Sequence, residues 1–272
     1  MKKLFLSLLA LLLLMGSMAN GEISKDIPCF SGEPDYVYQD DKLHIQIKRV
    51  QESGITYFVS DIRVADPGVL KTALTGKGEA TVSALAIKNQ AVFAINGDDY
   101  GVHKYGTIIR QGELLRANNT TRHMLAIDSQ GDFSIRTDRS GENPKQLAEE
   151  LLANGVVNTL EFGPELVRGG QAVSLKTKFD VISVRDTQLE PRTAIGQLGP
   201  LHYIVMIVDG RNPGYSDGIS LKDLQQLMLR YGAVTAINLD GGGSTTLYFQ
   251  GTVINQPSGG RERTVTDIIY FK

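Results

Sequence analysis

A carboxylate followed by three glycines and a run of hydroxyls is the most chemically suggestive stretch of this 272-residue chain. Asp240 ends an apolar run, and Gly241-Gly242-Gly243 and Ser244-Thr245-Thr246 follow it. Consecutive glycines are useful where a chain turns sharply or where another group must approach the backbone closely. The N–H and hydroxyl donors here could converge into a nest for an anionic oxygen, with Asp240 at its rim. The alternative is a tight turn in which the glycines only supply positive φ.

Polar clusters stand at the ends of other apolar, strand-like runs. Asn96-Gly97-Asp98-Asp99 follows one run, and Asp209-Gly210-Arg211 follows another. Arg192 and Arg263 each stand at the start of a further run. An arginine fork binds carboxylate or phosphate in a bidentate manner, so Arg192 and Arg211 are natural anion clamps. A surface ion pair explains either arginine alone equally well. If the clusters meet at one sheet edge, they form a pocket for a substrate with hydroxyls and a phosphate.

The same residues exclude or weaken other common chemistries. The glycine stretch lacks the lysine of a phosphate-binding Walker loop, and Thr246 stands where a nucleophile elbow needs glycine. The single cysteine, Cys29, excludes an intrachain disulfide and a cysteine-ligated zinc site. A net charge of -2 argues against a general nucleic-acid binder. Asp98, Asp99 and Asp240 could hold a divalent cation such as calcium, but no EF-hand spacing is present, so a metal site stays undecided.

The elements that must position these residues predict an α+β fold. Apolar and polar residues alternate over 43–47 and again over 56–64, which predicts a β-hairpin over 42–64. Helical patterns predict short helices over 79–88, 144–154 and 220–231. We expect a mixed, twisted β-sheet with these few helices packed on it, and polar clusters at strand ends that form one pocket.

The first 19 residues have the pattern of a secretory signal. Lys2-Lys3 form the charged region, residues 4–15 the apolar stretch, and Ser17-Met18-Ala19 a small-x-small cleavage site. The apolar stretch is short for a bilayer span. We therefore expect cleavage near Asn20, no stable membrane span after it, and a secreted or extracytoplasmic protein of the bacterial envelope.

Five stretches between residues 80 and 272 form a recognisable set. They are AINGDDYG (94–101), PRTAIG (191–196), VDGR (208–211), NLDGGGSTTL (238–247) with the helical segment 218–237 before it, and ERTVTDIIYF (262–271). Together they resemble the phosphodiester glycosidase family, whose bacterial members include many exported proteins linked to exopolysaccharide. We therefore expect a phosphodiester glycosidase-like domain over 80–272, after an N-terminal linker and β-hairpin region over 20–79.

The resemblance implies hydrolysis of a sugar-1-phosphate diester at its anomeric C–O bond. Phosphate is already a good leaving group, so arginines and the glycine stretch would stabilise the departing charge. Asp240, favoured over Asp209, would activate water or stabilise the oxocarbenium-like centre. The catalytic candidates are therefore Asp240, Asp209 and Asn96, and the substrate-binding candidates are Arg192, Arg211, Gly241, Gly242, Gly243, Ser244, Thr245 and Arg263.

The sugar itself is not specified, because Asp98-Asp99-Tyr100 replaces the small residue and aromatic that the family often has there. Two other functions remain open. A non-catalytic envelope protein that binds sugar phosphate or polysaccharide would need the anion clamp without the base. A phosphodiesterase that cuts the P–O bond would normally use a metal pair or a histidine nucleophile, and the four scattered histidines weigh against it.

Overall fold

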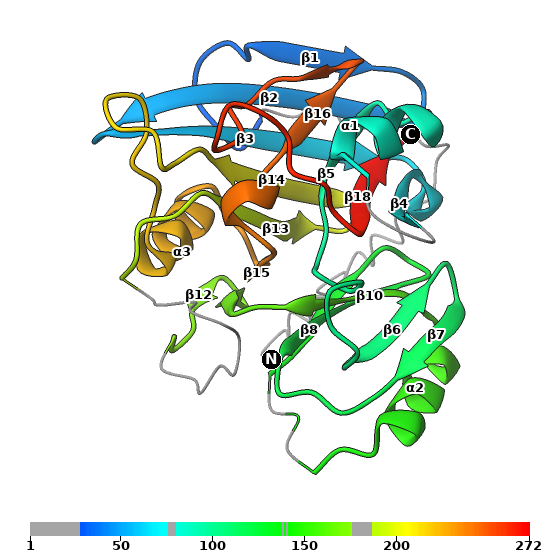
Figure 1. Cartoon of the computed structure of the whole chain (residues 1–272). Coiled ribbons are helices and arrows are strands. Elements are labelled where there is room, and N and C mark those ends of the chain that lie inside the picture. The colour runs from blue at the N-terminus through cyan, green and yellow to red at the C-terminus, as the bar shows by residue number, and fades with distance from the viewer. Residues whose placement is uncertain (1–27, 76–79, 138, 140, 176–186) are drawn as a thin grey trace, which may run out of the picture.

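The computed structural model describes residues 28–75, 80–137, 139, 141–175 and 187–272 of the chain. The predicted signal over 1–19 lies outside these ranges. The described residues form an eight-stranded, a five-stranded and a three-stranded sheet and a two-stranded ribbon, with three α-helices on their outer faces (Figure 1).

The eight-stranded sheet has the order β1-β2-β3-β14-β13-β15-β11-β12. In that order the strands are Tyr36–Gln39, Leu43–Glu52, Ile55–Val64, His202–Val208, Arg192–Gly199, Thr235–Asn238, Glu165–Arg168 and Gln171–Ala172. The five-stranded sheet has the order β17 (Thr252–Val253), β16 (Leu247–Phe249), β5 (Phe93–Asn96), β18 (Asp267–Phe271) and β4 (Leu70–Leu74). The three-stranded sheet contains β10 (Val156–Phe162), β8 (His123–Asp128) and β9 (Phe133–Arg136), and the ribbon contains β6 (Thr107–Arg110) and β7 (Glu113–Ala117). The helices are α1 (Val82–Lys88), α2 (Pro144–Ala153) and α3 (Leu221–Arg230), and the 3₁₀ turns are η1 (Pro67–Val69) and η2 (Gly242–Ser244).

The α+β class is confirmed, but the pairing is not mixed as we expected. Every strand pair within the described ranges is antiparallel. Parallel neighbours need a long crossover connection, usually through a helix. The chain makes such a crossover through α3 from β14 to β15, but β13 lies between these two strands and pairs antiparallel with both.

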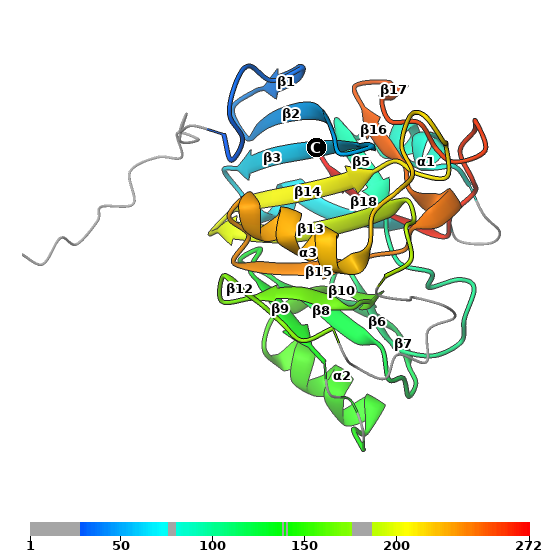
Figure 2. The ribbon, with the colours of Figure 1, turned by 90° about the vertical axis from the view of Figure 1, so that its left-hand side faces the viewer.

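Apolar side chains on both faces of the eight-stranded sheet explain the layers. On β14, Tyr203, Val205 and Ile207 belong to the core shared with the five- and three-stranded sheets. Ile204 and Met206 point to the opposite face, where they pack with α3. A strand buried on both faces has a continuous apolar sequence, as 203–208 does. Figure 2 shows α3 across the outer face of this sheet.

The hairpin predicted over 42–64 is confirmed, with β2 and β3 paired along their whole length. β3 also pairs with β14, so this N-terminal hairpin is built into the main sheet. The three predicted helices are confirmed as well. In α3, Ser220 accepts a hydrogen bond from the N–H of Asp223 at 3.1 Å, and Leu224 and Met228 are among its buried residues.

Candidate active site

Three of the predicted polar clusters meet at one end of the eight-stranded sheet. β14 ends directly before Asp209, and its antiparallel partner β13 begins with Arg192. β15, the other neighbour of β13, ends just before Leu239 and Asp240. Asn96 ends β5 and therefore arrives from the five-stranded sheet. The clusters thus meet between two sheets, and not along the edge of a single sheet as we expected.

Asn96 fastens the two sheets together at this point. Its side chain is 1% exposed. Its Nδ2 donates to the carbonyl oxygen of Asp240 at 2.6 Å, and its Oδ1 accepts from the hydroxyl of Thr193 at 2.8 Å and from the N–H of Thr246 at 3.3 Å. A buried amide that is bonded on both sides fixes the backbone around it. Asn96 therefore positions Asp240. Both polar atoms of the Asn96 side chain are bonded to other residues of the protein.

Asp240 presents its carboxyl group at the rim of this junction, with 20% of the side chain exposed. Its Oδ1 accepts from the N–H of Gly241 at 2.9 Å, and its Oδ2 lies 3.3 Å from a guanidinium nitrogen of Arg263. Burial raises the pKa of Asp240 above its ordinary value, the charge of Asp99 adds to this effect, and Ser244 and Arg263 oppose it. A carboxylate with a raised pKa is suited to accepting a proton from water.

The glycine stretch forms the tight turn η2 and not an open nest. The N–H of Gly241 donates to the Asp240 carboxylate, that of Gly242 to the carbonyl oxygen of Pro191 at 2.9 Å, and that of Ser244 to Gly241 at 3.1 Å. These donors are therefore already used by acceptors of the protein. The N–H groups of Gly241 and Gly242 are not free for the anion nest that we expected, and the stretch adopts the alternative, a glycine turn.

Close packing of two arginines explains why this turn contains glycines. Gly242 has φ of 58°, and a Cβ there would lie 3.1 Å from Nη2 of Arg211. A Cβ on Gly243 would lie 3.3 Å from Cδ of Arg263. Both contacts are tighter than most Cβ contacts, so an added side chain would displace each arginine by a few tenths of an ångström. The missing side chains let two guanidinium groups approach the turn, one at Gly242 and one at Gly243.

Arg211 and Arg263 are each held on one side and open on the other. The Nε of Arg211 donates to Glu190 at 2.5 Å, and the Nε of Arg263 donates to the hydroxyl of Ser244 at 3.1 Å. Their side chains are 50% and 56% exposed. Two oriented, solvent-accessible guanidinium groups beside a small turn can bind an oxyanion such as phosphate.

Arg192 and Thr245 do not share this arrangement. Arg192 is 5% exposed, and it donates to the carbonyl oxygens of Ile219 at 3.4 Å and Gln188 at 3.2 Å. Thr245 is 1% exposed. Both residues are therefore buried. Arg192 supports the loops around Arg211 through these hydrogen bonds and does not point into the open site.

Asp209 is also enclosed, with 1% of its surface exposed. Its carboxylate accepts from Nδ2 of Asn255 and the hydroxyl of Tyr215, both at 2.9 Å, and from the N–H of Gln256 at 3.1 Å. Burial raises the pKa of Asp209, and these hydrogen bonds oppose the rise. Asp209 thus joins two loops and presents no free oxygen to the site.

The two acids after Asn96 have separate cationic partners. Asp98 lies 3.2 Å from Arg110, whereas Asp99 binds Arg122 through both carboxylate oxygens and lies 3.2 Å from Nε2 of His103. The carboxylates considered for calcium therefore do not converge. Among the described residues, no group of three or more histidine, cysteine, aspartate or glutamate side chains is arranged to hold a metal ion.

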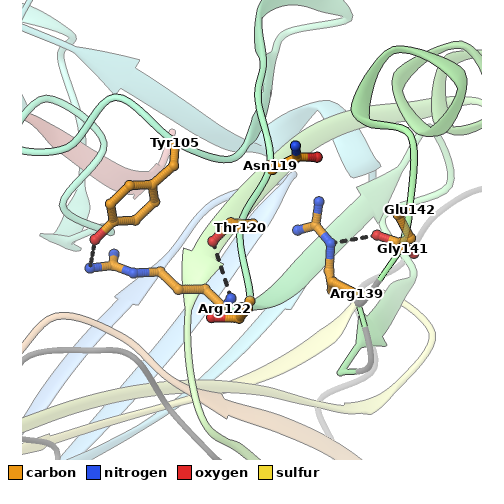
Figure 3. Close-up of a pocket in the computed structure, with 8 residues that line it drawn as sticks. Tyr105, Asn119, Thr120, Arg122, Arg139, Gly141 and Glu142 are labelled. Carbon is orange, nitrogen blue, oxygen red and sulfur yellow. Dashed lines mark hydrogen bonds and ion pairs between the residues drawn. The ribbon is translucent and has the colours of Figure 1, made fainter.

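Arg122, which was not among the predicted site residues, connects Asp99 to a cavity of about 490 Å³ (Figure 3). Nη2 of Arg122 donates to the hydroxyl of Tyr105 at 2.9 Å, and the guanidinium lies 4.9 Å from the centre of that ring. Arg139 and Glu142, an ion pair of 2.7 Å, form the far wall. The sequence gives no signal for Arg122, since its partners lie 17 and 23 residues earlier in the chain.

The model of the phosphodiester glycosidase family matches residues 89–272. The chain belongs to this family. The resemblance identified from the motifs is thereby confirmed, and the match contains the turn η2, both exposed arginines and Asp240.

Curated relatives cover a similar part of the chain. The SPbeta prophage-derived uncharacterized protein YomE of Bacillus subtilis (strain 168) is 30% identical over 196 residues, which is 70% of this chain and 29% of that protein. The N-acetylglucosamine-1-phosphodiester alpha-N-acetylglucosaminidase of Mus musculus is 27% identical over 218 residues, 72% of this chain and 40% of the mouse protein. The chain therefore spans less than half the length of these two relatives.

Solved structures share the fold. The catalytic domain of the zebrafish N-acetylglucosamine-1-phosphodiester alpha-N-acetylglucosaminidase, auto-inhibited by its pro-peptide, superposes with a TM-score of 0.67 at 20% identity, covering 85% of this chain and 82% of that one. A hypothetical protein from Synechocystis superposes with a TM-score of 0.66 at 18% identity, covering 85% and 62%. No helix among the described residues is long and apolar enough to cross a membrane.

Proposed function

We propose that this phosphodiester glycosidase family member hydrolyses the glycosidic C–O bond of a sugar-1-phosphate diester. The observation that carries the proposal is the placement of Asp240 beside a turn over which Arg211 and Arg263 lie with open guanidinium faces. One carboxylate and two oriented cations are what a reaction needs when its leaving group is an anionic phosphate.

In the proposed reaction, the two arginines bind the phosphate oxygens and a water molecule lies next to Asp240. The water oxygen bonds to the anomeric carbon while the bond from that carbon to the phosphate oxygen breaks. The electron pair of that bond leaves with the phosphate, where Arg211 and Arg263 stabilise the developing charge. Asp240 accepts the proton of the water. The charge of Asp99 adds to the raised pKa of Asp240, which suits Asp240 to accept that proton.

The natural substrate that we propose is a phosphodiester in envelope or extracellular glycan, and the chain acts outside the cytoplasm. The support is the signal pattern over 1–19 and the name of the mouse relative, an N-acetylglucosamine-1-phosphodiester alpha-N-acetylglucosaminidase. Sequencing of the mature N-terminus from the native host tests the export. A chain that begins near Asn20 supports it, and a chain that begins at residue 1 or 2 refutes it.

The reaction is tested with a UDP-sugar and a synthetic sugar-1-phosphate diester in water labelled with O-18, with and without chelator. Incorporation of the label into the released sugar is the expected result, because the C–O bond breaks. Label in the phosphate would instead identify a phosphodiesterase that cuts the P–O bond. Tight binding of the diester without any turnover would favour the alternative, a non-catalytic sugar-phosphate-binding protein. Asp240→Asn serves as the background control.

A further inference from the structure

Glu262, which stands directly before Arg263, turns inward from an exposed segment of the chain. Residues 259–264 are all described, and Glu262 is the one among them that is half-buried. The segment forms no helix or strand. Its main chain is next fixed at Val265, whose N–H donates to the carbonyl oxygen of Ala80 at 2.8 Å. The position of Arg263 therefore depends on what holds Glu262.

The carboxylate of Glu262 is bound to the start of α1, 179 residues earlier in the chain. Oε1 accepts from the N–H of Ser83 at 2.9 Å, and Oε2 accepts from the hydroxyl of Ser83. The N–H groups in the first turn of a helix have no acceptor inside the helix, and hydrogen bonds to a carboxylate are stronger than neutral ones. The side chain of Thr81 satisfies a second such N–H, that of Ala84, at 3.2 Å. Glu262 is therefore a cap that α1 receives from a distant part of the chain.

α1 is a firm support for this contact. Leu85 of α1 is 3% exposed and packs in one cluster with Ala94 of β5 and Ile268 of β18. Figure 1 shows α1 beside these two strands. β5 ends in Asn96, whose side chain positions Asp240. α1 and the acid of the active site are thus fixed to the same sheet.

Arg263 extends from the same stretch of backbone toward the active site. Its Nε donates to the hydroxyl of Ser244 at 3.1 Å, and its Nη2 lies 3.3 Å from Oδ2 of Asp240. An arginine side chain has large rotamer freedom, which it must lose when it binds an anion in one orientation. Two adjacent residues, Glu262 and Arg263, thus attach one segment to α1 on one side and to η2 on the other.

We propose that Glu262 is a positioning residue of the active site. Its bonds to Ser83 hold the backbone at Arg263 so that the guanidinium lies over η2 beside Asp240. A displacement of about 1 Å in a group that binds the transition state can cost about a hundredfold in rate. Glu262 itself touches no substrate in the proposed reaction. The inference rests on the proposed hydrolysis, since it concerns the residue that holds one of the two phosphate-binding arginines.

The test compares Glu262→Ala with Thr81→Ala, because both remove a cap of α1 and only the first releases the segment that carries Arg263. We expect both variants to unfold at a lower urea concentration than wild type. Only Glu262→Ala should lower kcat/KM for the sugar-1-phosphate diester, by about tenfold. Glu262→Gln should recover most of this loss, because its carboxamide oxygen still accepts from the N–H of Ser83. Glu149→Ala, a change of an exposed glutamate on α2, is the matched control and keeps wild-type values.

Two further readouts separate positioning from capping. In an Arg263→Ala background, Glu262→Ala should cause no further loss of kcat/KM, because the effects of residues that act through one another are not additive. The order parameter of the Arg263 Nε–H, from N-15 relaxation, should fall in Glu262→Ala and not in Thr81→Ala. Wild-type kcat/KM or an unchanged order parameter in Glu262→Ala would overturn the positioning role while leaving the hydrolase intact. An equal loss of kcat/KM in Thr81→Ala, or additive losses in the double variant, would do the same.

Failure of the proposed hydrolysis would give a different result. If wild type turns over no diester, the hydrolase is rejected, and calorimetry with the same diester takes the place of kcat/KM. Weaker binding and a lower Arg263 order parameter in Glu262→Ala, with neither change in Thr81→Ala, would keep the positioning role. Affinity that is equal in Glu262→Ala and wild type, or absent in both, would reject the positioning role together with the hydrolase.

Discussion

Replacing Asp240 by Asn separates the proposed chemistry from folding. The side chain keeps its shape and its Oδ1, so the hydrogen bond from the N–H of Gly241 survives. The change removes the negative charge and the ability to accept a proton from water. It also weakens the contact with Arg263, which is 3.3 Å long. The structural and the chemical costs can therefore be estimated separately.

The loss in free energy of unfolding caused by Asp240→Asn is small. The side chain of Arg263 is 56% exposed, and exposed ion pairs contribute about 0–1 kcal/mol to the free energy of unfolding. The chemical cost is larger, because loss of a general base lowers kcat by about a hundredfold or more. That factor corresponds to about 2.7 kcal/mol or more of transition-state stabilisation. Asp240→Asn should therefore unfold at nearly the wild-type urea concentration while its kcat collapses.

The assay measures kcat, KM and a pH profile on one sugar-1-phosphate diester, with circular dichroism to confirm folding. Burial raises the pKa of Asp240, and only the ionised form accepts a proton, so wild-type kcat/KM falls as the pH falls through that raised value. This acidic limb should be absent in Asp240→Asn. Asp41→Asn, an exposed acid in the turn after β1, is the matched control. A folded Asp240→Asn protein with near wild-type kcat would refute the assignment.

Four further substitutions test the surroundings of the site. Arg211→Lys should raise KM for the diester about tenfold, because the guanidinium fork beside Gly242 is lost. Arg192 is buried, so Arg192→Lys should lower the urea midpoint of unfolding and change KM less. The opposite pattern would exchange the roles of the two arginines. Gly242→Ala should weaken substrate binding and cost about 1 kcal/mol of stability, because φ is 58° and the new methyl meets Arg211; unchanged KM and stability would contradict the close packing. Asp267 is 0% exposed, and burial raises its pKa well above the ordinary value, with Arg110 opposing. Its contribution to stability is present at acidic pH and lost as the pH rises through the folded-state pKa, so wild-type urea midpoints should decline over that window and those of Asp267→Asn should not.

Elements that depend on neighbouring residues were predictable from the sequence. The β2–β3 hairpin follows from alternation and a glycine turn, and α3 follows from the cap at Ser220 and an apolar stripe. The order of the strands was not predictable, because it depends on which segment enters between β14 and β15. That segment is β13, which precedes both in the chain, and its insertion makes the pairing antiparallel.

The site was predictable to a similar degree. The motifs led to Asp240, Arg211 and Arg263, which the structure brings together around η2. The supporting cation Arg122 was missed, since its role depends on contacts with a loop 17 to 23 residues away and not on any local pattern. Ion pairs of this kind are formed by the fold, and the sequence near either partner does not record them.

Asp209 and Asp240 show why the sequence alone could favour one of the two acids but could not identify the base. Each follows a buried strand and precedes glycine, so the local patterns are alike. The two acids differ in which segment of the fold covers their carboxylates. The segment at Asn255 and Gln256, 46 and 47 residues further along the chain, covers Asp209 and satisfies its oxygens. Asp240 is followed by three glycines. Because they have no side chains, Arg211 and Arg263 can pack closely against Gly242 and Gly243. The run of glycines therefore marks the acid that stays open to substrate, and this physical difference is the reason to assign the base to Asp240.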